Sequence, residues 1–264
     1  MSDAPVFETT DLGKTFPARG GTVRALDTVS MRLLSGRNLG IVGESGAGKS
    51  TLLSILLGLE RPTSGAVRFH GESLDPDDRP LMARLRREVQ VVFQDPRTSL
   101  DPRMRVGSIV AEPLRALRVP GDHAVIVASA LAGVGLDPDV ADRYPREFSG
   151  GQRQRIAIAR ALAPSPRVLV ADEPVSALDV TVRAQILELL ESLRETLGLT
   201  LLLVSHDLAV VGRLCDDILV LRAGRVEENG TAEGIFRAPR SPYTRRLLDS
   251  VPTLPAGTSL RSGV

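Results

Sequence analysis

The sequence predicts an α/β protein, and two observations support this. An apolar run from Leu39 to Val42 leads into a glycine-rich loop, and an apolar helix over Ser50 to Leu57 follows it. Further apolar runs end in polar residues and are separated by helical segments, as strands of an α/β sheet are. With 264 residues, 42% hydrophobic and 25% charged, the chain can bury a sizeable core as one domain with a subdomain.

The glycine-rich loop fits the phosphate-loop pattern of Gly, four residues, Gly-Lys and then Ser or Thr. Backbone N–H groups at a helix N-terminus and the helix dipole both attract phosphate. Lys49 can reach the β- and γ-phosphates, and Ser50 is left to hold Mg²⁺. A glycine-rich turn that happens to carry a lysine is the alternative, and the order of strand, loop and helix disfavours it. The loop consists of Gly43, Glu44, Ser45, Gly46, Ala47, Gly48, Lys49, Ser50 and Thr51.

Two segments before this loop, Val6 to Leu12 and Val23 to Leu33, mix apolar and β-branched residues. They predict an antiparallel β layer with a Pro/Gly-containing turn at 17–21. Phe16 lies just before the turn and has two interpretations. It is either a core side chain at the end of a strand or a platform on which adenine stacks.

After the loop helix, a short strand over Ala66 to Phe69 precedes a polar connector that runs to residue 79. A strand over Val89 to Phe93 follows and ends on Gln94. A polar side chain at the C-terminal end of such a strand faces the usual ligand crevice, where Gln94 can contact Mg²⁺ or water. Taken alone, Gln94 is better explained as a simple loop glutamine.

From about residue 102 to residue 164 the sequence shows no convincing β run, and helices are predicted over Val106 to Leu117 and Ala124 to Leu131. We therefore expect a helical insert. It closes with a turn that opens the helix over 153–162, with Ser149 as its N-cap. The turn offers a hydroxyl and several N–H groups to an anion, although an ordinary capped helix has the same pattern. Its residues are Ser149, Gly150, Gly151 and Gln152.

An apolar strand from Val168 onward ends in two carboxylates, Asp172 and Glu173. Because alternate side chains at a strand end point apart, Asp172 can join a Mg²⁺ shell while Glu173 reaches an attacking water. A long helix follows, with a predicted core stripe from Val182 to Leu197. The next strand, Thr200 to Val204, brings His206 to the same edge of the sheet. There His206 contacts the γ-phosphate, orients Glu173 and water, or has a structural role.

The final segment predicts a hairpin that pairs Asp217 to Leu221 with Arg225 to Glu227, followed by short helices around Ile235 and Thr244. Pro, Gly and Ser dominate residues 253–264, which predicts a flexible tail.

Composition limits the classes of partner and compartment. No stretch approaches the roughly 18 apolar residues of a membrane span, and the N-terminus has no signal-peptide pattern, so we expect a cytoplasmic chain. The one cysteine, Cys215, leaves no disulfide framework and is expected to be a small buried residue. The 33 Lys and Arg nearly balance the 32 Asp and Glu. We therefore expect no nucleic-acid partner.

These motifs occur in the order found in ATP-binding cassette (ABC) ATPases, which the chain resembles throughout. The resemblance implies a P-loop NTPase fold with a RecA-like core, an N-terminal antiparallel β layer and an inserted α-helical subdomain over approximately 97–164. It also implies that the ATPase domain covers 1–252, that 253–264 is the tail, and that ATP and Mg²⁺ are the cofactors.

The resemblance also assigns roles to individual residues. Glu173 is the general base for attack of water on the γ-phosphate, and Lys49, Mg²⁺ and His206 stabilise charge, together with Ser149 of an opposing cassette. Phe16 takes the position of the family's adenine-stacking aromatic. The implied catalytic residues are Lys49, Gln94, Glu173 and His206. The implied Mg²⁺ ligands are Ser50, Gln94 and Asp172. The implied ATP contacts are Phe16, the nine loop residues, Gln94, Ser149, Gly150, Gly151, Gln152 and Asp179.

Finer motifs are similar to those of peptide and nickel importers. They include Phe93-Gln94-Asp95-Pro96 and the segment Pro239 to Thr244, in which Ser241 replaces the usual histidine. The implied protein is the ATP-binding and ATP-hydrolysing subunit of an importer of di- or oligopeptides, peripheral on the cytoplasmic side of the cell membrane. Its implied partners are integral membrane permease subunits, a second ABC ATPase subunit and, indirectly, an extracellular solute-binding protein. The alternatives are a nickel or other small-solute importer, a soluble cassette protein, a phosphate-loop kinase and a non-catalytic ATP-binding regulator.

Overall fold

The computed structural model describes residues 5–18, 20–94, 99–176 and 178–249 of the chain. The chain divides into two compact units. The first comprises Met1–Leu56, Glu60–Gly71 and Leu203–Val264, and the second comprises Leu57–Leu59 and Glu72–Leu202. The predicted flexible tail at 253–264 lies outside the described residues. It stays a prediction.

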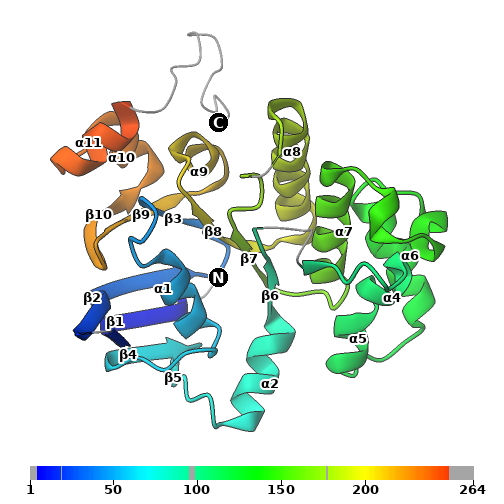
Figure 1. Ribbon diagram of the computed structural model, residues 1–264, viewed down its shortest axis with the longest axis horizontal. Coiled ribbons are helices and arrows are strands. Elements are labelled where there is room, and N and C mark those ends of the chain that lie inside the picture. Colours follow the sequence, from blue (N-terminus) through cyan, green and yellow to red (C-terminus); the bar gives the residue numbers. More distant parts are fainter. Residues whose placement is uncertain (1–4, 19, 95–98, 177, 250–264) are drawn as a thin grey trace. The chain divides into compact units, whose positions relative to one another are not determined.

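The N-terminal part of the first unit is an antiparallel β layer, as predicted. Strand β1 (Pro5–Ala18) pairs with β2 (Gly21–Leu34) on one edge and with β4 (Ser64–Phe69) on the other. Figure 1 shows the three strands side by side, coloured from blue to cyan. Strand β1 is longer than expected, because its pairing with β2 continues to residues 18 and 21. Strands β1 and β2 therefore extend into the segment 17–21 that was predicted as a turn.

The rest of the first unit supplies the strand that leads into the phosphate loop. Strand β3 (Leu39–Val42) pairs in parallel with β9 (Asp217–Arg222), which forms a hairpin with β10 (Arg225–Thr231). The predicted strand over 39–42 and the predicted hairpin are both confirmed. The helices of this unit are α1 (Lys49–Leu56), α9 (Leu208–Leu214), α10 (Ala232–Arg237) and α11 (Pro242–Asp249).

The second unit contains a parallel pair of buried strands, β6 (Val89–Val92) and β7 (Val168–Asp172), in register from Val89 opposite Val168. Between residues 102 and 164 its described part forms helices and no strand, as predicted. Strand β8 (Thr200–Ser205) begins in this unit and ends in the first. The other elements are β5 (Glu72–Ser73), α2 (Arg79–Glu88), α4 (Val106–Val110), α5 (Glu112–Ala116), α6 (His123–Gly133), η1 (Pro138–Asp142), η2 (Pro145–Glu147), α7 (Gly150–Leu162) and α8 (Val180–Leu197).

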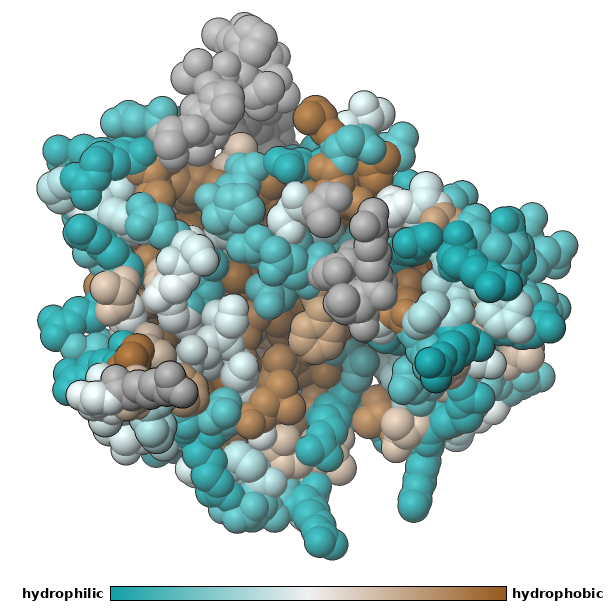
Figure 2. All heavy atoms as spheres, in the orientation of Figure 1, coloured by the Kyte–Doolittle hydropathy of each residue, from teal (hydrophilic) through white to brown (hydrophobic). Residues whose placement is uncertain are grey.

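Helix α2 was not predicted, because its arginines hide its apolar stripe. The helix starts at a cap, since the Asp78 side chain accepts a hydrogen bond from the backbone N–H of Leu81. It buries Leu81, Met82 and Leu85 on one face, while its other face is charged. Figure 2 shows hydrophilic side chains at the position that α2 occupies in Figure 1. An amphipathic pattern in a strongly charged segment is thus sufficient for a helix.

Two helix predictions need correction. The single helix expected over 106–117 is two short helices, α4 and α5, which meet at Ala111. Pro113 lacks an N–H and fits only the first turn of a helix, so a new helix begins there. The core stripe of α8 ends at Leu193, because Leu197 is 56% exposed. The helix stops one residue later at Gly198, which has φ +63°.

Two expectations from composition concern the whole chain. In the described part of the chain, no helix is long and apolar enough to cross a membrane. Cys215 is buried, as predicted for a small apolar residue.

Candidate active site

The phosphate loop lies between β3 and α1 in the first unit, as the pattern requires. The ammonium of Lys49 donates hydrogen bonds to two carbonyl oxygens of the loop, those of Gly43 at 2.7 Å and Glu44 at 3.0 Å. Lys49 is only 7% exposed, whereas Ser45 and Ser50 are exposed. The loop thus curls around a buried positive charge and leaves its rim accessible. This arrangement fits the phosphate groups of a nucleotide.

Close packing of the backbone explains two of the loop's glycines. A Cβ atom on Gly43 would collide with the carbonyl oxygen of Leu221, at the end of β9. Gly48 has φ +103°, and a Cβ there would lie 2.6 Å from the carbonyl oxygen of Ala25. The turn between β9 and β10 also supports the loop, because the N–H of Gly224 donates to the carbonyl of Ala47 at 3.0 Å. Strand β2 therefore packs against the loop, and the β9–β10 turn is hydrogen-bonded to it.

The carboxylate pair at the end of β7 is arranged differently from the prediction. Strand β7 ends at Asp172, and Glu173 leaves it with φ +46°, in the left-handed region that few non-glycine residues adopt. The expected alternation along a strand therefore does not extend to Glu173. Instead, a turn fixes this residue, because its carbonyl accepts hydrogen bonds from the backbone N–H and the hydroxyl of Ser176. Such an outlier indicates a position that the surrounding structure enforces.

The second unit brings Gln94 and Glu173 together. The side-chain amide of Gln94 donates a hydrogen bond to the carboxylate of Glu173, with 3.3 Å between Nε2 and Oε2. The two residues follow the neighbouring strands β6 and β7, which explains how positions 79 residues apart in sequence meet. Asp172, the other carboxylate of the pair, is half-buried at the end of β7. A carboxylate and an amide are thus assembled at one sheet edge, where strand ends usually meet ligands.

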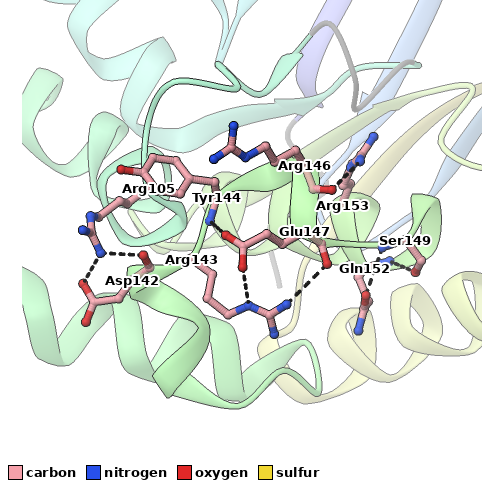
Figure 3. Close-up of polar contacts among 9 residues, drawn as sticks. All are labelled: Arg105, Asp142, Arg143, Tyr144, Arg146, Glu147, Ser149, Gln152 and Arg153. Atoms are coloured by element: carbon pink, nitrogen blue, oxygen red, sulfur yellow. Dashed lines mark hydrogen bonds and ion pairs between the residues drawn. The ribbon is translucent and has the colours of Figure 1, made fainter.

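The second predicted anion site is the N-terminus of α7, and Ser149 is its N-cap, as expected. Ser149 and Gln152 cap each other, as Figure 3 shows: the Gln152 N–H donates to the Ser149 hydroxyl at 3.3 Å, and the Ser149 N–H donates to the Gln152 side chain at 3.0 Å. Ser149 and Gly150 are exposed. A Cβ on Gly151 would collide with Val182 of α8, so glycine permits this helix to approach α8 closely.

Residues just before this helix hold it in place, and sequence reasoning missed them. The carboxylate of Glu147 accepts the backbone N–H of Tyr144 at 2.7 Å and the Nε–H of Arg143 at 3.2 Å. From the other side, Arg153 of α7 donates to the carbonyl of Pro145 at 2.8 Å. Figure 3 shows these side chains converging on the turn η2. The backbone hydrogen bond from Tyr144 and the nearby Arg143 lower the pKa of Glu147, outweighing burial.

Three further residues were predicted to contact ATP or to take part in catalysis: Asp179, His206 and Phe16. Asp179 is the N-cap of α8, where its carboxylate accepts the N–H of Val182 at 2.9 Å. His206 is exposed and lies between β8 and α9. Phe16 is half-buried within β1, and the ammonium of Lys14 lies 4.8 Å from the centre of its ring. Phe16 is therefore outside the buried core, and its stacking on adenine stays a prediction.

The predicted metal ligands are one hydroxyl, one amide and one carboxylate. Ser50 belongs to the first unit, and Gln94 and Asp172 belong to the second. Among the described residues, no three His, Cys, Asp or Glu side chains gather to form a metal site. Oxygen donors of these three kinds suit Mg²⁺, which is usually held by one or two carboxylates together with phosphate oxygens and water.

Comparison with known proteins identifies the family. The family model described as "ABC transporter" matches residues 26–176, which include the phosphate loop, the Ser149 turn and both carboxylates. The chain belongs to this family. Its fold, with an antiparallel β layer, a parallel strand pair and a helical segment, is that of an ABC ATPase, as the sequence predicted.

Relatives and solved structures agree with this assignment. The chain is 47% identical over 259 residues to the dipeptide transport ATP-binding protein DppF of Escherichia coli, and the match covers 95% of this chain and 77% of DppF. It is 45% identical over 260 residues to DppF of Haemophilus influenzae, covering 96% and 80%. A post-hydrolysis structure of the ATP-binding cassette MJ0796, bound to ADP and phosphate, matches with a TM-score of 0.76 at 32% identity, over 86% of this chain and 98% of that one.

Proposed function

We propose that this ABC cassette hydrolyses ATP to power a membrane importer of di- or oligopeptides. The observation that carries the proposal is the extent of the match to dipeptide-transport subunits, which covers about 95% of the chain at 47% identity. This match extends beyond the nucleotide motifs common to all cassettes. An importer of nickel or another small solute is the alternative within the same group, and a soluble cassette not coupled to transport is the alternative of another class.

The proposed chemistry is Mg²⁺-dependent attack of water on the γ-phosphate. Glu173 is the general base, and its hydrogen bond with Gln94 orients the carboxylate. Lys49 and His206 stabilise the charge that develops on the phosphate. When bound, Mg²⁺ supplies further charge stabilisation, and we propose Ser50, Gln94 and Asp172 as the residues that hold it. Phe16 stacks on adenine in this proposal, and Asp179 is among the ATP contacts.

The proposed assembly contains two cassettes and two kinds of further partner. ATP binds to the phosphate loop of one cassette and to Ser149, Gly150 and Gly151 of the other. The exposure of Ser149 and Gly150 at a helix N-terminus supports this role. Integral membrane permease subunits bind the cassette pair on the cytoplasmic side of the membrane. A solute-binding protein outside the cell delivers cargo to the permease.

The test is transport by the complete complex in proteoliposomes. The cassette is co-expressed with the permease subunits, solute-binding protein and any second cassette encoded beside its gene. We expect ATP-dependent uptake of a labelled dipeptide, and loss of uptake with Glu173→Gln in this cassette. The matched control is Glu188→Gln, which changes an exposed carboxylate on α8 to the same amide and should leave uptake intact.

Three results would contradict parts of the proposal. Uptake of labelled Ni²⁺ without uptake of peptides would favour the alternative within the importer group. Failure of the cassette to copurify with any permease subunit from gently solubilised membranes would favour a soluble cassette. Uptake that persists in the Glu173→Gln complex would remove Glu173 from the base role.

A further inference from the structure

The C-terminal motif from Pro239 to Thr244 reaches the phosphate loop through one side chain. We propose that Tyr243 is a positioning residue of this loop: its hydroxyl holds the Gly43–Glu44 peptide, and through that peptide it sets the place of the Lys49 ammonium. The C-terminal segment thereby controls nucleotide affinity. The inference rests on the nucleotide site proposed above and adds a residue from outside the nucleotide motifs.

A single peptide group links Tyr243 to Lys49. The N–H of Glu44 donates a hydrogen bond to the Tyr243 hydroxyl at 3.3 Å. The carbonyl of Gly43, which belongs to the same peptide group, accepts a hydrogen bond from the Lys49 ammonium at 2.7 Å. Because a peptide group is planar, its N–H and its carbonyl cannot turn independently. Rotation of this peptide would weaken both contacts, so the tyrosine hydroxyl and the lysine ammonium restrain each other.

The ring of Tyr243 is itself held firmly. Tyr243 is 3% exposed, and the guanidinium of Arg222 lies 4.9 Å from the ring centre, within the range of a cation–π contact. Arg222 is the last residue of β9, next to Leu221, whose carbonyl packs against Gly43. The hydroxyl thus approaches the loop from a fixed position beside it.

Ser241 connects this tyrosine to strand β10. Its hydroxyl donates to the carboxylate of Glu227 at 2.6 Å and accepts the backbone N–H of Tyr243 at 3.0 Å. The N–H groups of Arg240 and Ser241 also donate to the carboxylate of Glu228, at 2.8 and 3.1 Å. The serine that departs from the usual motif therefore anchors the start of α11. The chain of contacts runs from β10 through Ser241 and Tyr243 to the phosphate loop.

The decisive variant is Tyr243→Phe, which deletes the hydroxyl and keeps the ring over Arg222. We expect the ATP Kd, measured by calorimetry on the purified full chain carrying Glu173→Gln to prevent turnover, to rise about three- to tenfold, the range that corresponds to one hydrogen bond. In the Tyr243→Phe chain with Glu173 intact, kcat/KM for ATP hydrolysis should fall by at least the same factor. Ser241→Ala should raise the Kd in the same direction, because it loosens the anchor of Tyr243.

A spectroscopic measurement reports the contact directly. The chain has two tyrosines and no tryptophan, so Tyr144→Phe leaves Tyr243 as its only strong ultraviolet fluorophore. In that background, ATP should change the tyrosine emission, because phosphate binding polarises the peptide to which the hydroxyl is bonded.

The outcomes separate this inference from the proposed nucleotide site. Loss of ATP binding in Lys49→Ala together with the expected shift in Tyr243→Phe would support both. Two results together would overturn the inference: a normal ATP Kd with a lowered melting temperature in Tyr243→Phe, and a tyrosine emission that ATP leaves unchanged in Tyr144→Phe. They would mean that the Tyr243 hydroxyl only stabilises the fold. Unchanged ATP binding in Lys49→Ala would overturn the nucleotide site itself.

Discussion

The amide of Gln94 donates a hydrogen bond to the carboxylate of Glu173, with 3.3 Å between Nε2 and Oε2. This bond ties the second residue after β6 to the first residue after β7. It gives the carboxylate a defined direction. In the proposed role of Glu173 as general base, this orientation reduces the rearrangement that the reaction needs.

The first prediction concerns this carboxylate. Glu173→Gln keeps the shape of the side chain but cannot accept a proton, so we expect kcat to fall by about 10²- to 10⁴-fold with a nearly unchanged ATP Kd. Steady-state phosphate release and equilibrium binding measure the two quantities. The matched surface change Glu188→Gln should alter neither. Near-normal turnover of Glu173→Gln would show that another group takes the proton.

The second prediction concerns Phe16. Removal of the ring in Phe16→Ala should raise the ATP Kd several-fold with little effect on kcat, because stacking contributes on the order of 1 kcal/mol. Phe16 is half-buried, so the fold should tolerate the change. Phe16→Tyr is the control, since it keeps a stacking ring and should bind ATP normally. A large fall in the melting temperature of Phe16→Ala with no change in Kd would assign the ring a packing role.

The third prediction tests whether the active site is composite. Lys49→Ala damages the phosphate loop, and Ser149→Arg damages the opposing anion site, so each variant alone should be inactive. A mixed dimer contains one undamaged combination of loop and helix, and mixing should therefore restore part of the ATPase activity.

If a different cassette pairs with this chain, the same two changes are distributed between the two subunits. Charge-assisted hydrogen bonds contribute roughly 1.5–3 kcal/mol each, so the loss of those from Ser149 should be measurable. Dimers that form in both formats but show no rescue would mean that Ser149 acts within its own chain.

The fourth prediction is a dependence of stability on pH at Glu147. Its pKa in the folded protein is lowered from the ordinary value of 4.5, first because of the Tyr144 N–H and then because of Arg143. A lowered folded-state pKa means that the stabilisation is present above pH ~4.5 and is lost as the pH falls through the folded-state value.

The Glu147→Gln variant should therefore melt at a lower temperature than the original chain at neutral pH. The gap in melting temperature between the two should narrow below pH ~4.5. Thermal unfolding at a series of pH values measures it, and Glu188→Gln serves as the surface control. A gap that is constant across the whole range would contradict the role given to this carboxylate.

The sequence was sufficient wherever the local structure depends on residues close together in the chain. The pattern from Gly43 to Thr51 predicted the phosphate loop, and the Ser149 turn predicted a capped helix, because both depend on local backbone geometry. Tyr243 was not predicted as a contact of Glu44, since 199 residues separate the two. The left-handed conformation of Glu173 was also missed. It depends on the turn with Ser176, and nothing in the residue type indicates it.

The left-handed backbone at Glu173 has a consequence for the engineering of this protein. With φ +46°, the backbone at Glu173 carries a strain of roughly 1 kcal/mol, because the residue has a side chain. Glycine at this position would relieve the strain, and asparagine would reduce it. A screen that selects only for heat resistance would therefore favour replacement of this carboxylate. The most heat-resistant variants from such a screen would include ones that no longer turn over ATP, so selection for stability has to be paired with an assay of turnover.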